Sequence, residues 1–227
     1  MKKSFSVAID GPSGAGKSTI AKLCAEKLGF LYVDTGAMYR TVGLAVMNAG
    51  IHSMDSESIA ALLPKIKITI EHDEKGMQRM MLDGKDVSSD IRSPQVSIYA
   101  SDVSSMPVVR TFLHEMQREL ASANKVIMDG RDIGTVLLPD ADLKIFLTAD
   151  ASDRAQRRYV ELLLRGVKAT YEEVLEDINY RDENDKTRSA APLRAAEDAI
   201  VIDTTGYSLE HSFAYICGLI EDKMLGP

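Results

Sequence analysis

The sequence predicts an α/β fold in which a five-stranded parallel sheet is flanked by helices. Three observations lead to this prediction. An apolar run near the start of the chain ends in the glycine-rich stretch Ile9–Thr19 (IDGPSGAGKST), which opens a helix. Short apolar segments then alternate with segments of helical periodicity. One stretch, residues 65–87, alternates instead with the period of a β-strand, which predicts a small antiparallel insertion.

The first elements establish the plan. Phe5–Ile9 is an apolar strand, and from Lys17 the apolar positions fall at helical spacing as far as Gly29, where a helix C-cap is expected. Leu31–Val33 predicts a second strand and Met38–Met47 a second helix. The same alternation continues after the insertion, with strands expected at 125–128, 143–147 and 199–202 and helices at 94–105, 107–121, 151–165, 171–183 and from 209 onward.

The insertion contains two turn-like breaks, at Asp73–Gly76 and at Asp83–Gly84. These breaks divide it into two or three short strands. Because sequential strands joined by tight turns pair antiparallel, we expect a separate small sheet beside the parallel one.

Composition excludes several function classes. With 227 residues the chain is long enough for one sizeable core, and its net charge of −7 argues against nucleic acid or an anionic membrane as the main partner. The apolar stretch at the N-terminus is too short for a signal peptide, and no run approaches a membrane span. The two cysteines, Cys24 and Cys217, are far apart in the sequence and predict two reduced, half-buried thiols. We therefore expect a cytoplasmic protein, and a monomer.

The glycine-rich loop has the pattern of a phosphate-binding loop. Gly11, Gly16, Lys17 and Ser18 match G-x-x-x-x-G-K-[ST], and the loop follows a strand and opens a helix, as that motif requires. Glycines let backbone N–H groups converge on phosphate oxygens, and the helix N-terminus adds partial positive charge. Lys17 would contact the β- and γ-phosphates, and the Ser18 hydroxyl would bind Mg²⁺. We expect a nucleoside triphosphate to be held by Gly11, Pro12, Ser13, Gly14, Ala15, Gly16, Lys17, Ser18 and Thr19.

This loop does not by itself distinguish between nucleotide-dependent switches, motor proteins and kinases. A GTPase needs N-K-x-D after a strand, whereas the candidate Asn124–Ile127 has isoleucine in place of the aspartate and leads into a strand. A motor is usually larger or has a nucleic-acid surface, and neither feature is evident in this acidic chain. A GTPase and a motor are therefore disfavoured.

Arginines predict a second anion site. In an open parallel sheet, ligands bind beyond the carboxyl ends of the strands, where Thr35, Asp129, Arg131 and Asp132 are expected. A guanidinium group suits a phosphate because it donates two parallel hydrogen bonds. A single arginine is more often a solvated surface charge, but three or more at strand ends in a chain with a phosphate-binding loop favour a second phosphate. The candidates are Arg40, Arg110, Arg131, Arg181 and Arg188.

A further set of arginines lies on one predicted helix. Arg154, Arg157, Arg158 and Arg165 share a helix face approximately. This face is either solvated or part of a lid that closes over the transferring phosphoryl group, with Gly166 as a hinge. The sequence leaves both alternatives open.

Four separated motifs occur in order along the chain: DGPSGAGKST, YVDTGAMYR, DGRDIGTVLLPDA and RDENDKTRSAAPL. Together they resemble the bacterial-type cytidylate kinases, and the likeness runs over essentially the whole chain. The resemblance implies a P-loop kinase core in one domain, 1–227, with a monophosphate-binding region at 36–105 that contains the insertion, and a lid at 151–170. It implies a nucleoside monophosphate kinase that transfers the γ-phosphate of Mg-ATP to CMP or dCMP.

The resemblance also implies roles for individual residues. The acceptor phosphate would lie against Thr35, Arg40 and Arg131, and the sugar against Arg181 and Asp185. The cytosine edge would be recognised by Ser101, Arg110, Asp132 and Arg188. The catalytic cations would be Lys17, Arg131, Arg157 and Arg158. Asp129 either holds a magnesium-bound water or caps a turn.

Two other functions remain possible from the sequence. One is a P-loop kinase for another monophosphate or for a small alcohol such as shikimate, which would need a carboxylate base and fewer arginines. The other is a nucleotide-dependent switch that has no acceptor and whose turnover is independent of any added monophosphate.

Overall fold

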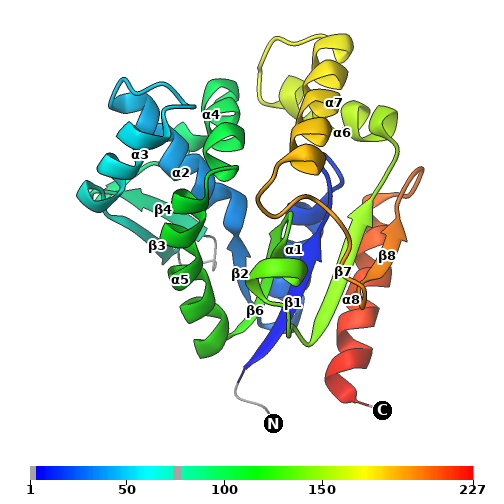
Figure 1. Ribbon diagram of the computed structural model, residues 1–227. Helices are drawn as coiled ribbons and strands as arrows, with labels where there is room; N and C mark the ends of the chain where they lie inside the picture. The colour runs from blue at the N-terminus through cyan, green and yellow to red at the C-terminus, as the bar shows by residue number, and fades with distance from the viewer. Residues whose placement is uncertain (1–3, 74–77, 227) are drawn as a thin grey trace.

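The computed structural model describes residues 4–73 and 78–226. In these ranges, five parallel strands form one sheet, as predicted, and their order is β2-β6-β1-β7-β8 (Figure 1). The strands are β1 (Phe5–Asp10), β2 (Leu31–Asp34), β6 (Lys125–Gly130), β7 (Leu143–Thr148) and β8 (Ile200–Asp203).

The strand register brings the predicted functional segments to one edge of this sheet. Asp10 pairs with Gly130, Asp34 with Asp129 and Thr148 with Asp203, so the carboxyl ends of neighbouring strands are level. The segments that follow β1, β2 and β6 therefore begin side by side, although they lie far apart in the sequence.

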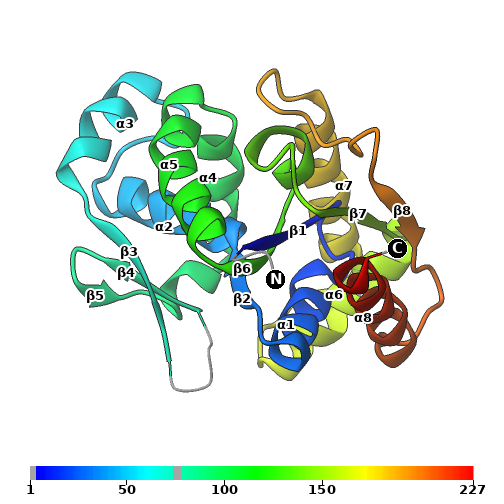
Figure 2. The ribbon, with the colours of Figure 1, turned by 90° about the horizontal axis from the view of Figure 1, so that it is seen from below.

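Helices cover both faces of the sheet. Because side chains alternate along a strand, Ile9 of β1 faces one side and Ala8 the other. On the side of Ile9, α1 (Lys17–Leu28) and α8 (Leu209–Leu225) lie next to each other, as Figure 2 shows, and close a core around Ile20 and Ile216. On the side of Ala8, a short π-helical turn, Ile133–Leu137, packs on Val33 and Met128 of the sheet.

The elements between β2 and β6, among which the monophosphate-binding region is expected and which are here called the acceptor region, have a core of their own, on the left in Figure 1. Met38, Met80 and Leu113 are three of its fully buried side chains. Within the described residues, the predicted insertion is a three-stranded antiparallel sheet, although its Asp73–Gly76 turn extends into residues that the structure does not describe. The region consists of α2 (Thr35–Asn48), α3 (Ser56–Leu62), β3 (Ile68–His72), β4 (Gln78–Leu82), β5 (Lys85–Asp86), α4 (Pro94–Ser104) and α5 (Pro107–Ala123).

Two further helices stand above the sheet at its other end (Figure 1). These are α6 (Ala151–Leu164) and α7 (Tyr171–Thr187), and they pack together through Ala155 and Ile178. Gly166 follows α6 with a φ of 73°, a left-handed conformation that suits glycine. The predicted end of the arginine-rich helix at this glycine is confirmed.

Some boundaries differ from the predictions. The second helix begins at Thr35 rather than Met38, because the Asp34 carboxylate accepts a hydrogen bond of 2.8 Å from the Ala37 N–H and caps the helix there. Helix α7 continues to Thr187, beyond the predicted end at 183. Sequence periodicity also missed short elements, which contain too few residues to show a period: α3, 3₁₀ turns at Leu63–Lys65 and Asp90–Arg92, and the π-helical turn.

The cysteines are not half-buried, as the sequence suggested. Cys24 is 0% and Cys217 1% exposed, because α1 and α8 pack tightly against each other and bring the two thiols together. Burial, and the neighbouring Cys217, raise the pKa of Cys24 to about 12. Both side chains belong to the core. None of the helices in the described residues has the length and apolar character to cross a membrane.

Candidate functional site

A cavity of about 930 Å³ opens at the carboxyl edge of the parallel sheet. Its walls come from the loop after β1, from α2 and α4 of the acceptor region, and from α6 and α7. Of the residues predicted for the site, Gly11, Pro12 and Ala15 are outside the lining of this cavity. The predicted residues that line it are Ser13, Gly14, Gly16, Lys17, Ser18, Thr19, Thr35, Arg40, Ser101, Arg110, Arg131, Asp132, Arg157, Arg158, Arg181, Asp185 and Arg188.

The glycines of the loop are required by its geometry. A Cβ on Gly11 would lie 1.9 Å from the Leu147 carbonyl oxygen, so the loop could not approach β7 with any other residue there. Gly16 caps α1 in a left-handed conformation, with a φ of 86°. The loop thus exposes the N-terminus of α1 to the cavity, as phosphate binding requires.

Lys17 is the first residue of α1, directly after this loop, and is only 5% exposed. Its ammonium group donates a hydrogen bond of 2.7 Å to the Pro12 carbonyl oxygen. Burial and the nearby Arg131 lower the pKa of Lys17 to about 7. An anion in the cavity would stabilise the charged form of this side chain and raise its pKa again.

Asp129, at the end of β6, lies beside the helix that the loop opens. In the described part of the chain, the hydrogen bonds to its carboxylate come from two side chains, the Ser18 hydroxyl at 2.7 Å and the Tyr32 hydroxyl at 2.8 Å. Burial and the nearby Asp34 raise the pKa of Asp129 above its ordinary value. These side-chain partners favour a metal role over the alternative of a turn cap.

The donor set fits Mg²⁺. A serine hydroxyl and a buried carboxylate supply the oxygen ligands that Mg²⁺ prefers, and this ion keeps several of its waters. In the described residues, no group of three or more His, Cys, Asp or Glu side chains is arranged to hold a metal. The Ser18–Asp129 pair is consistent with an ion that is bound mainly by water and phosphate.

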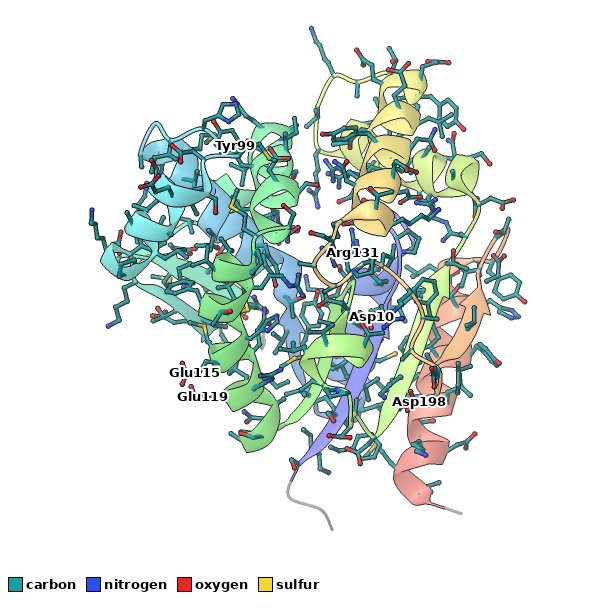
Figure 3. The ribbon with its side chains drawn as sticks, in the orientation of Figure 1. Asp10, Tyr99, Glu115, Glu119, Arg131 and Asp198 are labelled. Atoms are coloured by element: carbon teal, nitrogen blue, oxygen red, sulfur yellow. The ribbon has the colours of Figure 1, made fainter. Side chains whose placement is uncertain are left out.

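Asp10, which sequence reasoning did not select, connects the two loops of the site. Its carboxylate accepts hydrogen bonds from the backbone N–H groups of Ile133 and Gly134, both at 2.7 Å. Burial raises the pKa of Asp10 to about 6, although the two N–H groups favour the charged form. Figure 3 shows Asp10 below Arg131, in the interior of the molecule. Asp10 thus fixes the segment that contains Arg131 against the strand that leads into the phosphate-binding loop.

Three predicted phosphate-binding residues meet at the ends of β2 and β6. The Thr35 hydroxyl donates to the Asp129 carbonyl oxygen at 2.8 Å, and Arg40 pairs with Asp34 at 2.7 Å. Arg131 donates to Asp185 of α7 at 2.6 Å. Burial disfavours the charge of Arg131, but the Asp185 carboxylate raises its pKa above the ordinary value.

Three of the four predicted base-recognition residues, Arg110, Asp132 and Arg188, form a buried ionic cluster, and Ser101 lines the same cavity. Arg110 and Arg188 both pair with Asp132, the latter at 3.2 Å. Two residues that sequence reasoning missed complete the cluster. The Arg110 guanidinium lies 5.8 Å from the centre of the Tyr39 ring, and Arg188 lies 3.5 Å from the Ser104 hydroxyl. The helical spacing of Ser101 and Ser104 is a signal by which the second serine could have been found.

The predicted helix face of arginines is divided in the structure: Arg157, Arg158 and Arg165 line the cavity, whereas Arg154 does not. Arg154 is 4% exposed and is bound to Asp182 of α7 and to the Ser13 carbonyl oxygen, at 2.6 and 2.8 Å. It connects the two helices to the phosphate-binding loop. Arg157 and Arg158 do line the cavity, where Arg157 donates to the Thr204 carbonyl oxygen at 2.7 Å.

Comparisons with known proteins agree with the geometry. The sequence model of the family described as cytidylate kinase matches residues 7–222. The cytidylate kinase of Caldicellulosiruptor saccharolyticus is 54% identical over 208 residues, 92% of this chain and 92% of that protein. The cytidylate kinase of Carboxydothermus hydrogenoformans is 48% identical over 217 residues, 96% of this chain and 97% of that protein. A crystal structure of an uncharacterized protein from Eubacterium ventriosum has the same fold, with a TM-score of 0.50 and 13% identity, and covers 96% of this chain and 99% of that one.

Proposed function

Because the chain belongs to the cytidylate kinase family, we propose that it transfers the γ-phosphoryl group of ATP to CMP or dCMP, giving ADP and CDP or dCDP. The observation that carries this proposal is the pairing of two anion sites in one cavity. A phosphate-binding loop faces a wall of arginines across the carboxyl edge of the sheet. Such a cavity suits a reaction in which both donor and acceptor are phosphates.

The donor half of the cavity is the loop and the start of α1. We propose that backbone N–H groups within 13–19 and the Lys17 ammonium group hold the triphosphate. Ser18 would bind Mg²⁺ directly and Asp129 through water. When bound, this ion neutralises charge on the phosphates of the donor.

The acceptor half would hold the monophosphate through Thr35, Arg40 and Arg131, and its sugar through Arg181 and Asp185. We propose that the base is recognised by Ser101 together with the ionic cluster of Arg110, Asp132 and Arg188. Cytosine O2 and N3 accept hydrogen bonds, which suits arginine donors, whereas its exocyclic amine donates and suits Ser101 or Asp132. Uracil has a carbonyl in place of that amine and would leave an acceptor of the site unpaired.

The transfer itself needs no general base. The second pKa of a phosphate monoester is about 6, so the acceptor is already an anionic nucleophile near neutral pH. Catalysis then depends on positioning and on cations near the transferring group, for which we propose Lys17, Arg131, Arg157 and Arg158. Arg157 and Arg158 lie on α6, so closure of a lid at 151–170 over the cavity would bring their charge to the phosphates.

We further propose a single functional domain in which residues 36–105 bind the monophosphate, and a cytoplasmic monomer. In the structure, this region has its own core beside the parallel sheet. Motion of the region relative to the sheet would close the cavity around both substrates.

The direct test measures ADP release from Mg-ATP with CMP, dCMP, UMP, AMP and shikimate supplied separately. We expect strong turnover with CMP and dCMP alone. In Lys17→Ala we expect loss of most of kcat with the fold retained, as judged by circular dichroism. Turnover with another acceptor would refute the base assignments, and turnover independent of any acceptor would favour a nucleotide-dependent switch.

A further inference from the structure

Tyr32 points a buried hydroxyl at the magnesium side of the cavity, and the proposed transfer gives it no role. Its side chain is 6% exposed, and its hydroxyl donates to Oδ1 of Asp129 at 2.8 Å. We propose that Tyr32 is a positioning residue for the metal site: it fixes the Asp129 carboxylate in the orientation in which the other oxygen faces Ser18. This inference deepens the proposed function and rests on Mg²⁺ being bound with a nucleotide at the loop.

The fold fixes the direction of this hydroxyl. Strands β2 and β6 are parallel neighbours, with Tyr32 level with Ile127 and Asp34 level with Asp129. The Tyr32 ring packs in the core between the sheet and α1, in the same cluster as Ile20 and Ile127. The ring therefore has little freedom. Its hydroxyl reaches the Asp129 carboxylate on the neighbouring strand β6, two residues beyond the position level with Tyr32.

Each oxygen of the Asp129 carboxylate accepts a hydrogen bond from a different side chain. Tyr32 donates to Oδ1, and Ser18 donates to Oδ2 at 2.7 Å. The single proton of the Ser18 hydroxyl is then directed at Asp129, which leaves the lone pairs of that oxygen free for a cation. This arrangement needs a carboxylate that does not rotate, and the Tyr32 hydroxyl supplies the second point that holds it.

Removal of the hydroxyl would leave Oδ1 without this donor and take away the second point that holds the carboxylate. Asp129 is 4% exposed, and the nearby Asp34 carboxylate further disfavours its negative charge. The carboxylate would then be free to turn away from Ser18. Outer partners of metal ligands typically change metal affinity by about 10- to 100-fold when they are removed.

The test uses Tyr32→Phe in the full chain, a change that removes only the hydroxyl. Mn²⁺ is titrated into the protein saturated with ADP, and free Mn²⁺ is measured by electron paramagnetic resonance. We expect binding of Mn²⁺ to weaken by about 10-fold. Binding of ADP in the presence of EDTA should be unchanged. Tyr99→Phe is the matched control, because Tyr99 packs on the acceptor core away from the lining of the cavity and should bind Mn²⁺ as the parent does.

Two further measurements distinguish a role of Tyr32 in positioning the metal site from a role in packing alone. If Tyr32 acts through the metal, raised Mg²⁺ restores kcat in Tyr32→Phe, whereas a distorted fold loses kcat at every Mg²⁺ concentration. Tyr32→Phe should also have no further effect on Mn²⁺ affinity in an Asp129→Asn background. Unchanged Mn²⁺ affinity, kcat that Mg²⁺ does not restore, or additive effects with Asp129→Asn would overturn the inference. A parent protein that binds Mn-ADP through Tyr32 but does not phosphorylate CMP would refute the proposed function and leave this inference standing.

Discussion

Asp10 offers the sharpest test of the electrostatics of the site. Its carboxylate is 4% exposed and is held by the N–H groups of Ile133 and Gly134. Burial raises its pKa from 3.8 to about 6. In Asp10→Asn the group no longer titrates, and the amide turns an NH₂ toward one of the two N–H groups. Asparagine therefore removes both the charge and its dependence on pH.

The direction in which Asp10 changes stability with pH follows from its raised pKa. Because the folded protein holds the Asp10 proton more tightly than the unfolded chain, this group adds stability below pH 3.8 that is lost as the pH rises through about 6. A difference of about 2 pKa units corresponds to about 3 kcal/mol in all, and about 2 kcal/mol of this is lost between pH 4.5 and pH 7.5. The parent should therefore gain about 2 kcal/mol relative to Asp10→Asn when the pH falls across that range.

The assay is urea unfolding of both proteins at half-unit steps of pH, with the free energies of unfolding subtracted at each step. The subtraction cancels the contributions of other titrating groups that Asp10 does not influence. The cost of the unpaired N–H group in the variant remains in the difference, but as a constant that does not change with pH. A difference that stays constant from pH 4.5 to pH 7.5 would refute the argument that burial governs this carboxylate.

Three other predictions follow from the site and the core. With a pKa of about 7, Lys17 is mostly neutral at pH 8. Because a bound phosphate favours the charged form of Lys17, nucleotide binding at pH 8 should take up about one proton. Calorimetry of ADP binding in buffers of different ionisation enthalpy measures this uptake, and equal heats in all buffers would contradict it. Arg188→Ala should raise the KM for CMP by at least about 10-fold and that for ATP much less, because Arg188 pairs with Asp132 in the acceptor cluster; steady-state kinetics that gave equal increases would remove it from that site. Cys24 and Cys217 should react with a thiol reagent such as Ellman's only after unfolding, because both are buried and the pKa of Cys24 is raised to about 12; rapid labelling of the native protein would contradict their burial.

The parts of the fold that could be predicted are those encoded by local pattern. The apolar run before Gly11 and the helical spacing after Lys17 place the loop between β1 and α1 without any knowledge of distant residues. The parallel sheet then brings Arg131 beside that loop, since the carboxyl ends of its strands share one edge. Sequence alone was therefore sufficient to predict that these two segments lie side by side.

The contacts that fix the site could not be predicted in this way. Tyr32 meets Asp129 across 97 positions of sequence, and Asp10 meets Ile133 across 123. No local period links such partners. Arg154 shows the same limit, because its helical spacing left a solvated face and a lid open, whereas its ion pair with Asp182 of α7 buries it, which fits neither alternative.

The carboxylates around the arginines explain how an acidic chain can bind two anionic substrates. Arg131 is held by Asp185, and Arg110 and Arg188 by Asp132, so these guanidinium groups are oriented before a nucleotide arrives. Such preorganisation lowers the side-chain entropy that binding would otherwise cost. It also means that a ligand must compete with buried carboxylates for the same donors. A dianionic phosphate offers more charge than one carboxylate and can take those hydrogen bonds, whereas the hydroxyl of a neutral alcohol cannot. The same pairs that keep the arginines in place therefore favour a phosphate acceptor over a sugar or shikimate hydroxyl.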